Sequence, residues 1–378
     1  MYLVLAISLS LLAGLSTSLK NQKIISALPY LFFFICPILT YFEVISVLTG
    51  FDNIYSSSIY FGISFYTVNI GYYLLKHRES IKSRPYIFLL CIINPLYLFT
   101  GPFPCQIPDK LRKINIRNFL KRLEIINSEL ILGVFFALIL APSLIPLFPL
   151  KNSFEFLDII MFGIIFELYV YYNFAGFSMI AWSFMRLFGI NVKRNFNQPF
   201  SSTSIIEYWQ KWHITLSNIL KELFFNPLKI KFGLFSTVFI VFCASAFWHG
   251  VTVNFLIWGI AHSLFWNISY YLHKKNNKIL NYLILIFGVI IGRIIFSENN
   301  IDFLLIKIRT LINISQWEFH FMNGFNTINL RFLDLINLFI CIFLIFLEIL
   351  IPRFFTLYKN YYSYLRTPVV SMIILIYI

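Results

Sequence analysis

Residues 232–250, FGLFSTVFIVFCASAFWHG, place a histidine at the end of a long apolar stretch. No Asp, Glu, Lys or Arg lies between Phe232 and Trp248, so this stretch is long and apolar enough to cross a membrane as a helix. An ionisable group at membrane depth is costly and is interpreted by default as part of a functional site. His249 is therefore the first candidate. A second histidine, His213, lies upstream in the aromatic stretch Trp209-Gln210-Lys211-Trp212-His213.

Composition decides the class of the chain. Hydrophobic residues make up 59% of its 378 residues and charged residues only 12%, with a mean hydropathy of +0.78. Soluble domains carry about 25% charged residues, so a soluble fold could not cover this much apolar surface. The excess of Lys and Arg is scattered through short connections, as in loops that set membrane topology. We therefore expect a multi-pass protein of the cell membrane, in contact with membrane lipids and with no nucleic-acid partner.

Apolar stretches of spanning length recur along the chain, since a membrane helix needs about 20 residues. They predict an all-α polytopic protein of about 10–12 membrane helices, forming one integral-membrane domain over residues 1–378. The first stretch has no basic region before it and is predicted to be a membrane helix, not a cleaved signal. The predicted spans are Tyr2–Leu19, Ile24–Leu48, Ile59–Leu75, Pro85–Phe99, Leu130–Leu150, Phe156–Tyr172, Phe174–Ile190, Phe232–Trp248, Val251–Leu272, Ile279–Phe296, Leu333–Ile351 and Pro368–Ile378.

Two segments depart from this pattern. Gln106–Ser128 mixes basic residues with Leu, Ile and Phe, which is typical of an amphipathic helix on a membrane surface and equally of a cytoplasmic loop. Within Asn191–Lys231, the part Ser204–Leu216 is too polar to span and too aromatic for a free loop. Irregular backbone at membrane depth survives only where protein or a water cavity covers it. We therefore expect re-entrant or in-plane helices around a central tunnel.

Several kinds of site are not favoured by the residues. The five cysteines have no C-x-x-C spacing, so neither a disulfide framework nor a bound metal is expected. No Ser/His/Asp set and no glycine-rich phosphate loop is evident, which argues against a self-contained hydrolase and a nucleotide-driven pump. No internal repeat supports an inverted-repeat transporter. We expect no bound cofactor.

Spacing separates the three histidines that lie among aromatic residues. His249 precedes His262 by 13 residues, or about 20 Å along a continuous helix, so these two could not share one small site. Gly250 and the end of the preceding span make His249 a helix-terminus residue, whereas His262 is buried along the next helix. His213 and His249 lie on separate elements that can converge. They are the better pair.

Two blocks of residues carry a family resemblance. The first is RNFNQPF at 194–200, followed by SIIEYWQKWHITLS at 204–217 and NPL at 226–228. The second is FWHGVTVNFLIWGIAH at 247–262. Together they resemble the signature of membrane-bound O-acyltransferases, in the bacterial branch of alginate O-acetylases and D-alanyl transfer proteins. The resemblance covers about Leu96–Leu264.

The resemblance implies an O-acyltransferase in which His249 is the catalytic residue and His213 a second important histidine. An imidazole is suited to take a proton from an acceptor hydroxyl near neutral pH. An apolar wall such as Phe247 and Trp248 should favour its neutral form. Residues expected to line the substrate tunnel or to position the substrates are Trp248, Trp212, Trp209, Asn254 and Asn173.

The resemblance also implies substrates and partners. The acyl group, acetyl in the first place, would come from a cytoplasmic thioester donor, acetyl-CoA or an acyl carrier. It would move across the membrane towards hydroxyls of an exported or cell-surface polysaccharide. A separate extracytoplasmic transferase is the expected protein partner. Two alternatives stay open: a lipid or protein O-acyltransferase of the same superfamily, and a histidine-dependent transporter or inactive scaffold.

Four positions depart from the family's pattern. Asn173 and Met179 stand where acids are usual, Ile219 where Trp is usual and Ser263 where Gly is usual. Losing the two acids would weaken a polar network behind the site. By contrast, Glu207 and Lys211 match the motif and stand at helical spacing, so we expect them to meet on one helix face and stabilise it.

Overall fold

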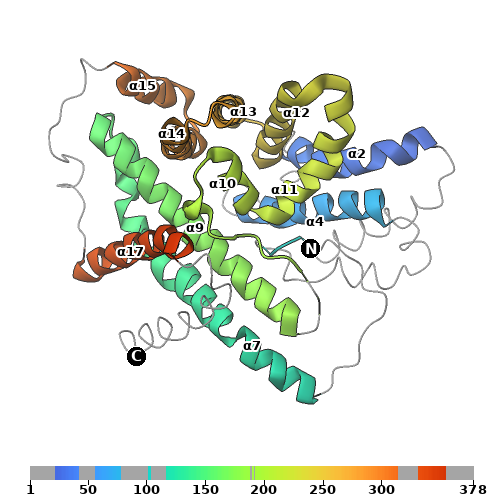
Figure 1. Ribbon diagram of the computed structural model, residues 1–378, viewed down its shortest axis with the longest axis horizontal. Helices are drawn as coiled ribbons and strands as arrows, with labels where there is room; N and C mark the ends of the chain where they lie inside the picture. Colours follow the sequence, from blue (N-terminus) through green and yellow to red (C-terminus); the bar gives the residue numbers. More distant parts are fainter. Residues whose placement is uncertain are drawn as a thin grey trace. The chain divides into compact units, whose positions relative to one another are not determined.

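The computed structural model describes residues 22–41, 56–77, 101–103, 116–187, 190, 192–313 and 331–354. Within these residues the regular structure is entirely helical (Figure 1), which confirms the all-α prediction. The chain forms two compact units, each described separately below. The first unit consists of Met1–Ile126, Ile180–Asn195 and His213–Val251, and the second of Asn127–Met179, Phe196–Trp212 and Thr252–Ile378.

Five helical stretches in the described part of the chain are long and apolar enough to cross a membrane. They agree with a polytopic membrane protein. The predicted spans Tyr2–Leu19, Pro85–Phe99 and Pro368–Ile378 lie outside the described residues, so the expected 10–12 helices and the central tunnel stay predictions. The five stretches are Ile116–Ser143, Phe156–Leu187, Ile214–His249, Lys278–Ser297 and Phe332–Leu350.

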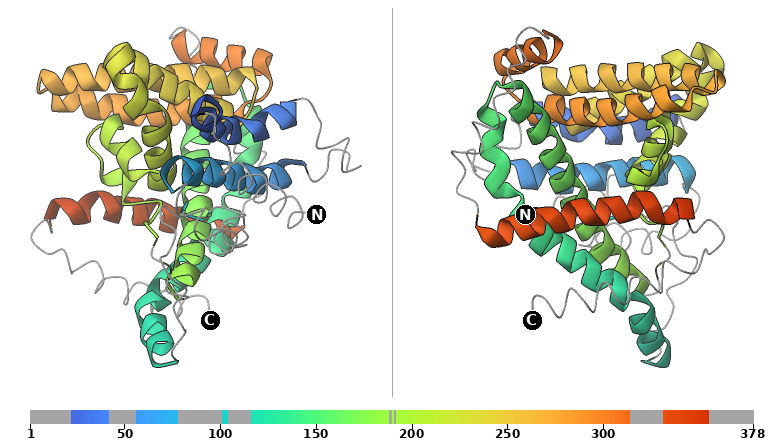
Figure 2. Two further views of the ribbon diagram at one scale, coloured as in Figure 1. Left: turned by 90° about the vertical axis from the view of Figure 1, so that its right-hand side faces the viewer. Right: turned by 60° about the vertical axis from the view of Figure 1, so that its left-hand side comes forward.

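The first unit is built on a pair of apolar helices. Its elements are α2 (Gln22–Tyr41), α4 (Ser56–Lys76), α11 (Ile214–Leu220), the π-helical η5 (Lys221–Phe225) and α12 (Asn226–His249). Helices α2 and α4 lie side by side (Figure 2), and Gly71 lets them approach closely, since a Cβ there would come within 2.7 Å of the Pro29 carbonyl oxygen. The Tyr30 hydroxyl donates to the Leu223 carbonyl over 2.8 Å, which ties α2 to η5.

The second unit packs its helices around a continuous aromatic and aliphatic core. Helices α13 and α14 run side by side (Figure 2). Helix α17 is tied to the rest by Glu348, whose carboxylate accepts hydrogen bonds from the Tyr171 hydroxyl and the Phe200 amide. The elements of this unit are η2 (Phe136–Leu140), α8 (Ala141–Ser143), η3 (Ile145–Asn152), η4 (Pro199–Ser201), α10 (Ile205–Lys211), α13 (Val253–Lys274), α14 (Lys278–Ser297), α15 (Ile301–Ile312) and α17 (Phe332–Phe354).

Two helices pass from one unit into the other and correct the predicted span boundaries. The spans Phe156–Tyr172 and Phe174–Ile190 are one helix, α9 (Phe156–Leu187), because no proline or turn sequence separates them. The basic part of Gln106–Ser128 from Ile116 onward does not form a separate element. It opens α7 (Ile116–Phe135), which continues without a break into the apolar residues.

Two further differences have local causes. The sequence did not predict α15, because its 12 residues are too short to be recognised as a span. Helix α12 is kinked at Gly233, which has φ 75° and ψ 178°. A residue with a side chain is disfavoured at that positive φ, so glycine is the residue that allows the kink.

Gly176 shows how closely α9 approaches the α7–η2 helix in the second unit. A Cβ at this position would lie 2.5 Å from the Ala137 nitrogen and 2.8 Å from the Gly133 oxygen. We predict that Gly176→Leu lowers the thermal stability of the detergent-solubilised protein, by about 1–3 kcal/mol or more, because the helices must move apart. An unchanged melting temperature would show that this close approach does not exist.

Candidate active site

His213 occupies a sharp turn between two short helices. It has φ 43° and ψ 52°, a left-handed conformation that is uncommon for a residue with a side chain. Asn195 stabilises the turn at the residues that follow. Its carbonyl accepts from the Ile214 amide over 2.8 Å, and its side-chain oxygen accepts from the Thr215 hydroxyl over 2.5 Å. The asparagine of the RNFNQPF block therefore fixes the backbone next to His213.

Aromatic rings surround the His213 imidazole in the first unit. Phe103 stacks on it with ring centroids 5.8 Å apart, and Phe65 lies at 6.1 Å. The Phe103 amide donates to the Thr215 hydroxyl over 3.0 Å, so the same turn also positions this ring. The Trp248 ring lies 6.4 Å from His213 on another side. The imidazole is thus enclosed by apolar ring faces.

His249 joins this group through Trp248. It is the last residue of α12, as predicted, and its ring lies 4.8 Å from that of Trp248. Trp248 therefore contacts both histidines, since His213 faces it as well. We call His213, His249, Trp248, Phe65 and Phe103 the histidine cluster. All five belong to the first unit.

Electrostatics favour a neutral His213. Its side chain is buried, with 6% of the residue exposed. Burial lowers the pKa of His213 well below its usual value of 6.5, and the charge of the nearby His249 lowers it further. An imidazole held neutral has one N–H donor and one acceptor nitrogen. The cluster can therefore donate a hydrogen bond and accept a proton in the same apolar enclosure.

Residues 114–271 match the membrane-bound O-acyltransferase family. This part of the chain is similar to that family. The match includes both sequence blocks and both histidines of the cluster, His213 and His249. The family resemblance expected from the two blocks is thus confirmed.

This chain is similar to proteins named for the acylation of peptidoglycan, alginate and teichoic acid. It is 25% identical to the peptidoglycan O-acetyltransferase of Helicobacter pylori over 65% of this chain and 49% of that protein. It is 28% identical to a probable alginate O-acetylase of Pseudomonas aeruginosa over 43% of this chain and 33% of that protein. It is 27% identical to the teichoic acid D-alanyltransferase of Bacillus subtilis over 31% of this chain and 32% of that protein. The chain thus matches half or less of the length of each of these relatives.

A second polar group of this chain lies in the second unit. The Glu167 carboxylate of α9 pairs with the Arg293 guanidinium of α14, and both residues are buried. The Tyr208 hydroxyl donates to Glu167 over 2.7 Å, and Arg293 lies over the Trp212 ring, 4.8 Å from its centroid. Tyr208 also stacks on Trp212 with ring centroids 5.4 Å apart. Trp212 is therefore fixed by this ion pair.

The sequence analysis missed Glu167 and Arg293. A signal was present, because Glu167 is the single charge between Asp158 and Arg186, and Arg293 is the single charge between Lys278 and Glu298. Such charges normally pair with each other or mark a site. The partners could not be matched from the sequence, since they stand 126 residues apart.

The other expected tunnel residues also lie in the second unit. Trp209 contacts the Trp258 and His262 rings, at 5.8 and 5.0 Å. Asn254 accepts from the Thr252 hydroxyl and donates to the carbonyls of Ile295 and Phe296, so it ties the start of α13 to the end of α14. Asn173 is half-buried on α9. Of the expected tunnel residues, Trp248 is the one that contacts His213 and His249 within the first unit. The tunnel roles of all five residues stay predictions.

The positions that depart from the family's pattern make ordinary packing contacts. Ile219 is fully buried in the core of the first unit, and Met179 packs against the core of the second. The Ser263 hydroxyl donates to the Ile260 carbonyl within its own helix. These three residues are accommodated by the folded chain.

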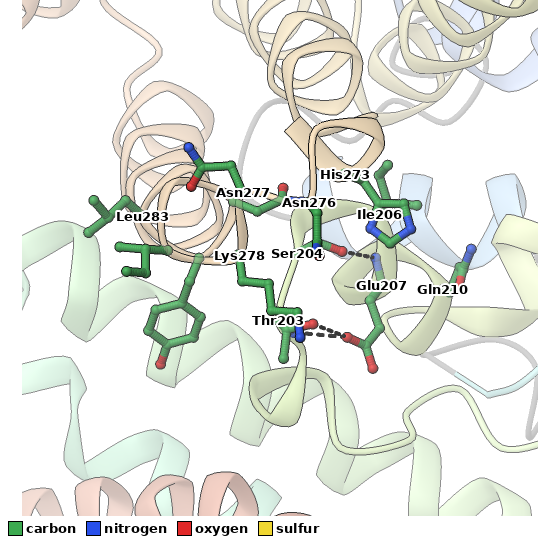
Figure 3. A pocket seen from close by; sticks show the side chains of 13 residues that line it. Thr203, Ser204, Ile206, Glu207, Gln210, His273, Asn276, Asn277, Lys278 and Leu283 are labelled. Atoms are coloured by element: carbon green, nitrogen blue, oxygen red, sulfur yellow. Dashed lines mark hydrogen bonds between the residues drawn. The ribbon is translucent and has the colours of Figure 1, made fainter. Parts of the chain in front are cut away.

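A pocket of about 810 Å³ opens between α10 and the α13–α14 connection (Figure 3). Glu207 lies in its wall, where it accepts from the Thr203 amide and pairs with Lys211 at 2.8 Å, which confirms the predicted helical contact. Burial alone would raise the pKa of Glu207, but bonds from Lys211 and Thr203 lower it overall. Glu207 therefore stabilises the start and face of α10. No group of three or more His, Cys, Asp or Glu suited to a metal occurs within the described residues.

The Glu167–Arg293 pair can be tested by a double-mutant cycle. We predict that Glu167→Leu or Arg293→Met alone lowers stability by about 3–5 kcal/mol, because the remaining charge stays buried without its partner. The double variant should be markedly more stable than the sum of the two losses implies. Thermal unfolding in detergent measures this. Simple additivity of the two single losses would contradict the pairing.

The lowered pKa of His213 has a consequence for pH dependence. The unfolded chain binds a proton near pH 6.5, whereas the folded chain resists it. The stability that depends on the neutral side chain is present above pH 6.5 and is lost as the pH falls below it. We predict that, as the pH falls below 6.5, the melting temperature of His213→Gln declines less steeply than that of the wild-type protein. Parallel curves for the two proteins would contradict this.

Proposed function

We propose that this chain is a membrane O-acyltransferase of the cell envelope. It moves an acyl group, acetyl in the first place, from a cytoplasmic thioester donor towards hydroxyls of an exported or cell-surface polysaccharide. The observation that supports this most strongly is the histidine cluster, where His249 and His213 both contact Trp248 inside one unit. The similarity of residues 114–271 to this family supports the reaction class, and the polymers named for the similar proteins support the class of acceptor.

His249 is the general base of the proposed reaction. Its imidazole takes the proton of the acceptor hydroxyl while the hydroxyl oxygen attacks the thioester carbonyl carbon. The carbon–sulfur bond then breaks, and the leaving thiolate takes the proton back from the imidazolium. The end of α12 favours the transient positive charge, because the last carbonyls of a helix point their negative ends at its C-terminus.

His213 stabilises the oxyanion in this proposal. As a neutral imidazole it has one N–H to donate to the carbonyl oxygen as negative charge develops there. The rings of Phe65, Phe103 and Trp248 exclude water from its surroundings, which strengthens such a hydrogen bond. The left-handed turn keeps the side chain at a fixed place on the backbone.

The partners follow from the same proposal. The donor is acetyl-CoA or an acyl carrier, used as a co-substrate and not as a bound cofactor. A separate extracytoplasmic transferase receives the acyl group or completes its delivery to the polymer. The protein acts in the cell membrane, where the donor and the acceptor lie on opposite sides.

The test is acylation of the surface glycans in cells. We predict that His249→Ala reduces acylation by about a hundredfold or more, because the acceptor hydroxyl loses its base. Mass spectrometry of surface glycans measures the product. His273→Ala is the matched control, since His273 is exposed at the end of α13 and should leave acylation unchanged. Normal acylation with well-expressed His249→Ala protein would overturn the assignment. Acyl groups found on lipid or protein instead of glycan would show that the acceptor is not a polysaccharide.

A further inference from the structure

Asn69 of α4 is a buried amide whose two polar atoms are both unpaired. The residue has 0% of its surface exposed. Neither its amide nitrogen nor its amide oxygen has a hydrogen-bond partner among the described residues. Burying an unpaired amide costs free energy, about 1–3 kcal/mol by mutational measurements. An apolar residue would be more stable at this position unless another molecule supplies the missing partners.

Asn69 lies on the same face of α4 as Phe65, which belongs to the histidine cluster. It follows Phe65 by four residues, so the two side chains lie on the same helix face, about 40° apart. Phe65 contacts His213 and Trp248, at 6.1 and 5.6 Å between ring centroids. Gly71, which packs against α2 at Pro29, lies on a different face of the helix. Asn69 is therefore one turn along α4 from the rings around the two histidines.

Trp248 provides an independent second observation. Its indole N–H is buried and also has no hydrogen-bond partner in the described part of the chain. The indole itself contacts both histidines. Within the described residues, the histidine cluster and the α4 turn next to Phe65 thus contain buried donors and an acceptor that have no partner.

The chemistry of these groups identifies the kind of molecule that fits. An Asn amide offers one acceptor and two N–H donors, and it pairs best with another amide, which offers the same groups in reverse. The aromatic wall favours a slender, mostly apolar chain. A thioester donor with a pantetheine arm has this character, because its thiol chain contains amide groups separated by methylenes.

We propose that Asn69 binds an amide of the pantetheine arm of the acyl donor and so positions the thioester at His249 and His213. This proposal rests on the acyl-transfer function proposed above. Asn69 is a positioning residue in it and takes no proton in the reaction. The amide of the donor then supplies hydrogen-bond partners for the Asn69 side chain.

The test compares two donors in the same protein. S-acetylpantetheine has amide groups, whereas S-ethyl thioacetate has none. Membranes of the acylating cells, which contain the full-length protein and its partner transferase, are supplied with purified surface glycan, and the released thiol is measured. We expect Asn69→Leu to lower kcat/KM for S-acetylpantetheine about tenfold, because one buried hydrogen bond is worth about that factor. For S-ethyl thioacetate the value should stay unchanged.

The melting temperature of Asn69→Leu and a matched control variant distinguish a donor-binding role of Asn69 from a purely structural one. Removing an unpaired buried amide should leave the melting temperature of Asn69→Leu unchanged or raise it. Thr67→Val is the control, because Thr67 is equally buried on α4 and its hydroxyl donates within the helix to the Ser64 carbonyl. It should lower neither donor's kcat/KM. If Asn69→Leu does not accumulate, Asn69→Ala is measured, since the ratio between donors is independent of the amount of active protein.

The outcomes distinguish this proposal from the one on which it rests. Equal losses with both donors, or no loss with either, would overturn the role of Asn69 while leaving acyl transfer intact. If wild-type protein released no thiol from either donor, acyl transfer itself would fail and the donor site with it. A loss confined to the amide-bearing donor supports both.

Discussion

A polar group inside an apolar helix bundle must find a partner within the protein, because neither lipid nor hydrocarbon side chains can supply one. In the second unit, two buried carboxylates meet this requirement. Glu167 pairs with Arg293 and accepts from Tyr208, and Glu348 accepts from Tyr171. These bonds join α9 to α14, α10 and α17, so the same contacts that satisfy buried charges also fix the positions of the helices.

In the first unit, the polar groups at the His213 turn have hydrogen-bond partners, whereas two other buried side chains have none among the described residues. Asn195 and Thr215 satisfy one another and the Phe103 amide, and so hold His213 in a strained conformation. Such strain costs of order 1–3 kcal/mol and persists only where the surroundings enforce it. Asn69 and the Trp248 N–H, by contrast, have no partner within the described residues. A strained turn and unpaired polar groups in the same unit are consistent with the substrate site proposed above.

Physical reasoning from the sequence predicted the class of fold and the two histidines but not the long-range pairings. The apolar runs at α12, α13, α14 and α17 had clear limits, because polar or charged residues bound them. The predicted span boundaries were wrong inside the continuous helix α9, because its sequence does not show whether one helix or two are present. His249 was placed correctly at a helix end because Gly250 follows it. The Glu167–Arg293 pair and the orphan amide of Asn69 depend on which helix faces meet, and one sequence does not specify that.

The positions of the two histidines are consistent with the opposite roles proposed for them. His213 precedes α11 and is enclosed by rings, so a positive charge on it is disfavoured and it is suited to donate a neutral hydrogen bond. His249 ends α12 and is only half-buried, next to helix carbonyls that attract positive charge. The helix end thus suits the residue that must become an imidazolium, whereas the aromatic enclosure suits the residue that must not. Trp248, in contact with both rings, keeps the two environments adjacent and separate.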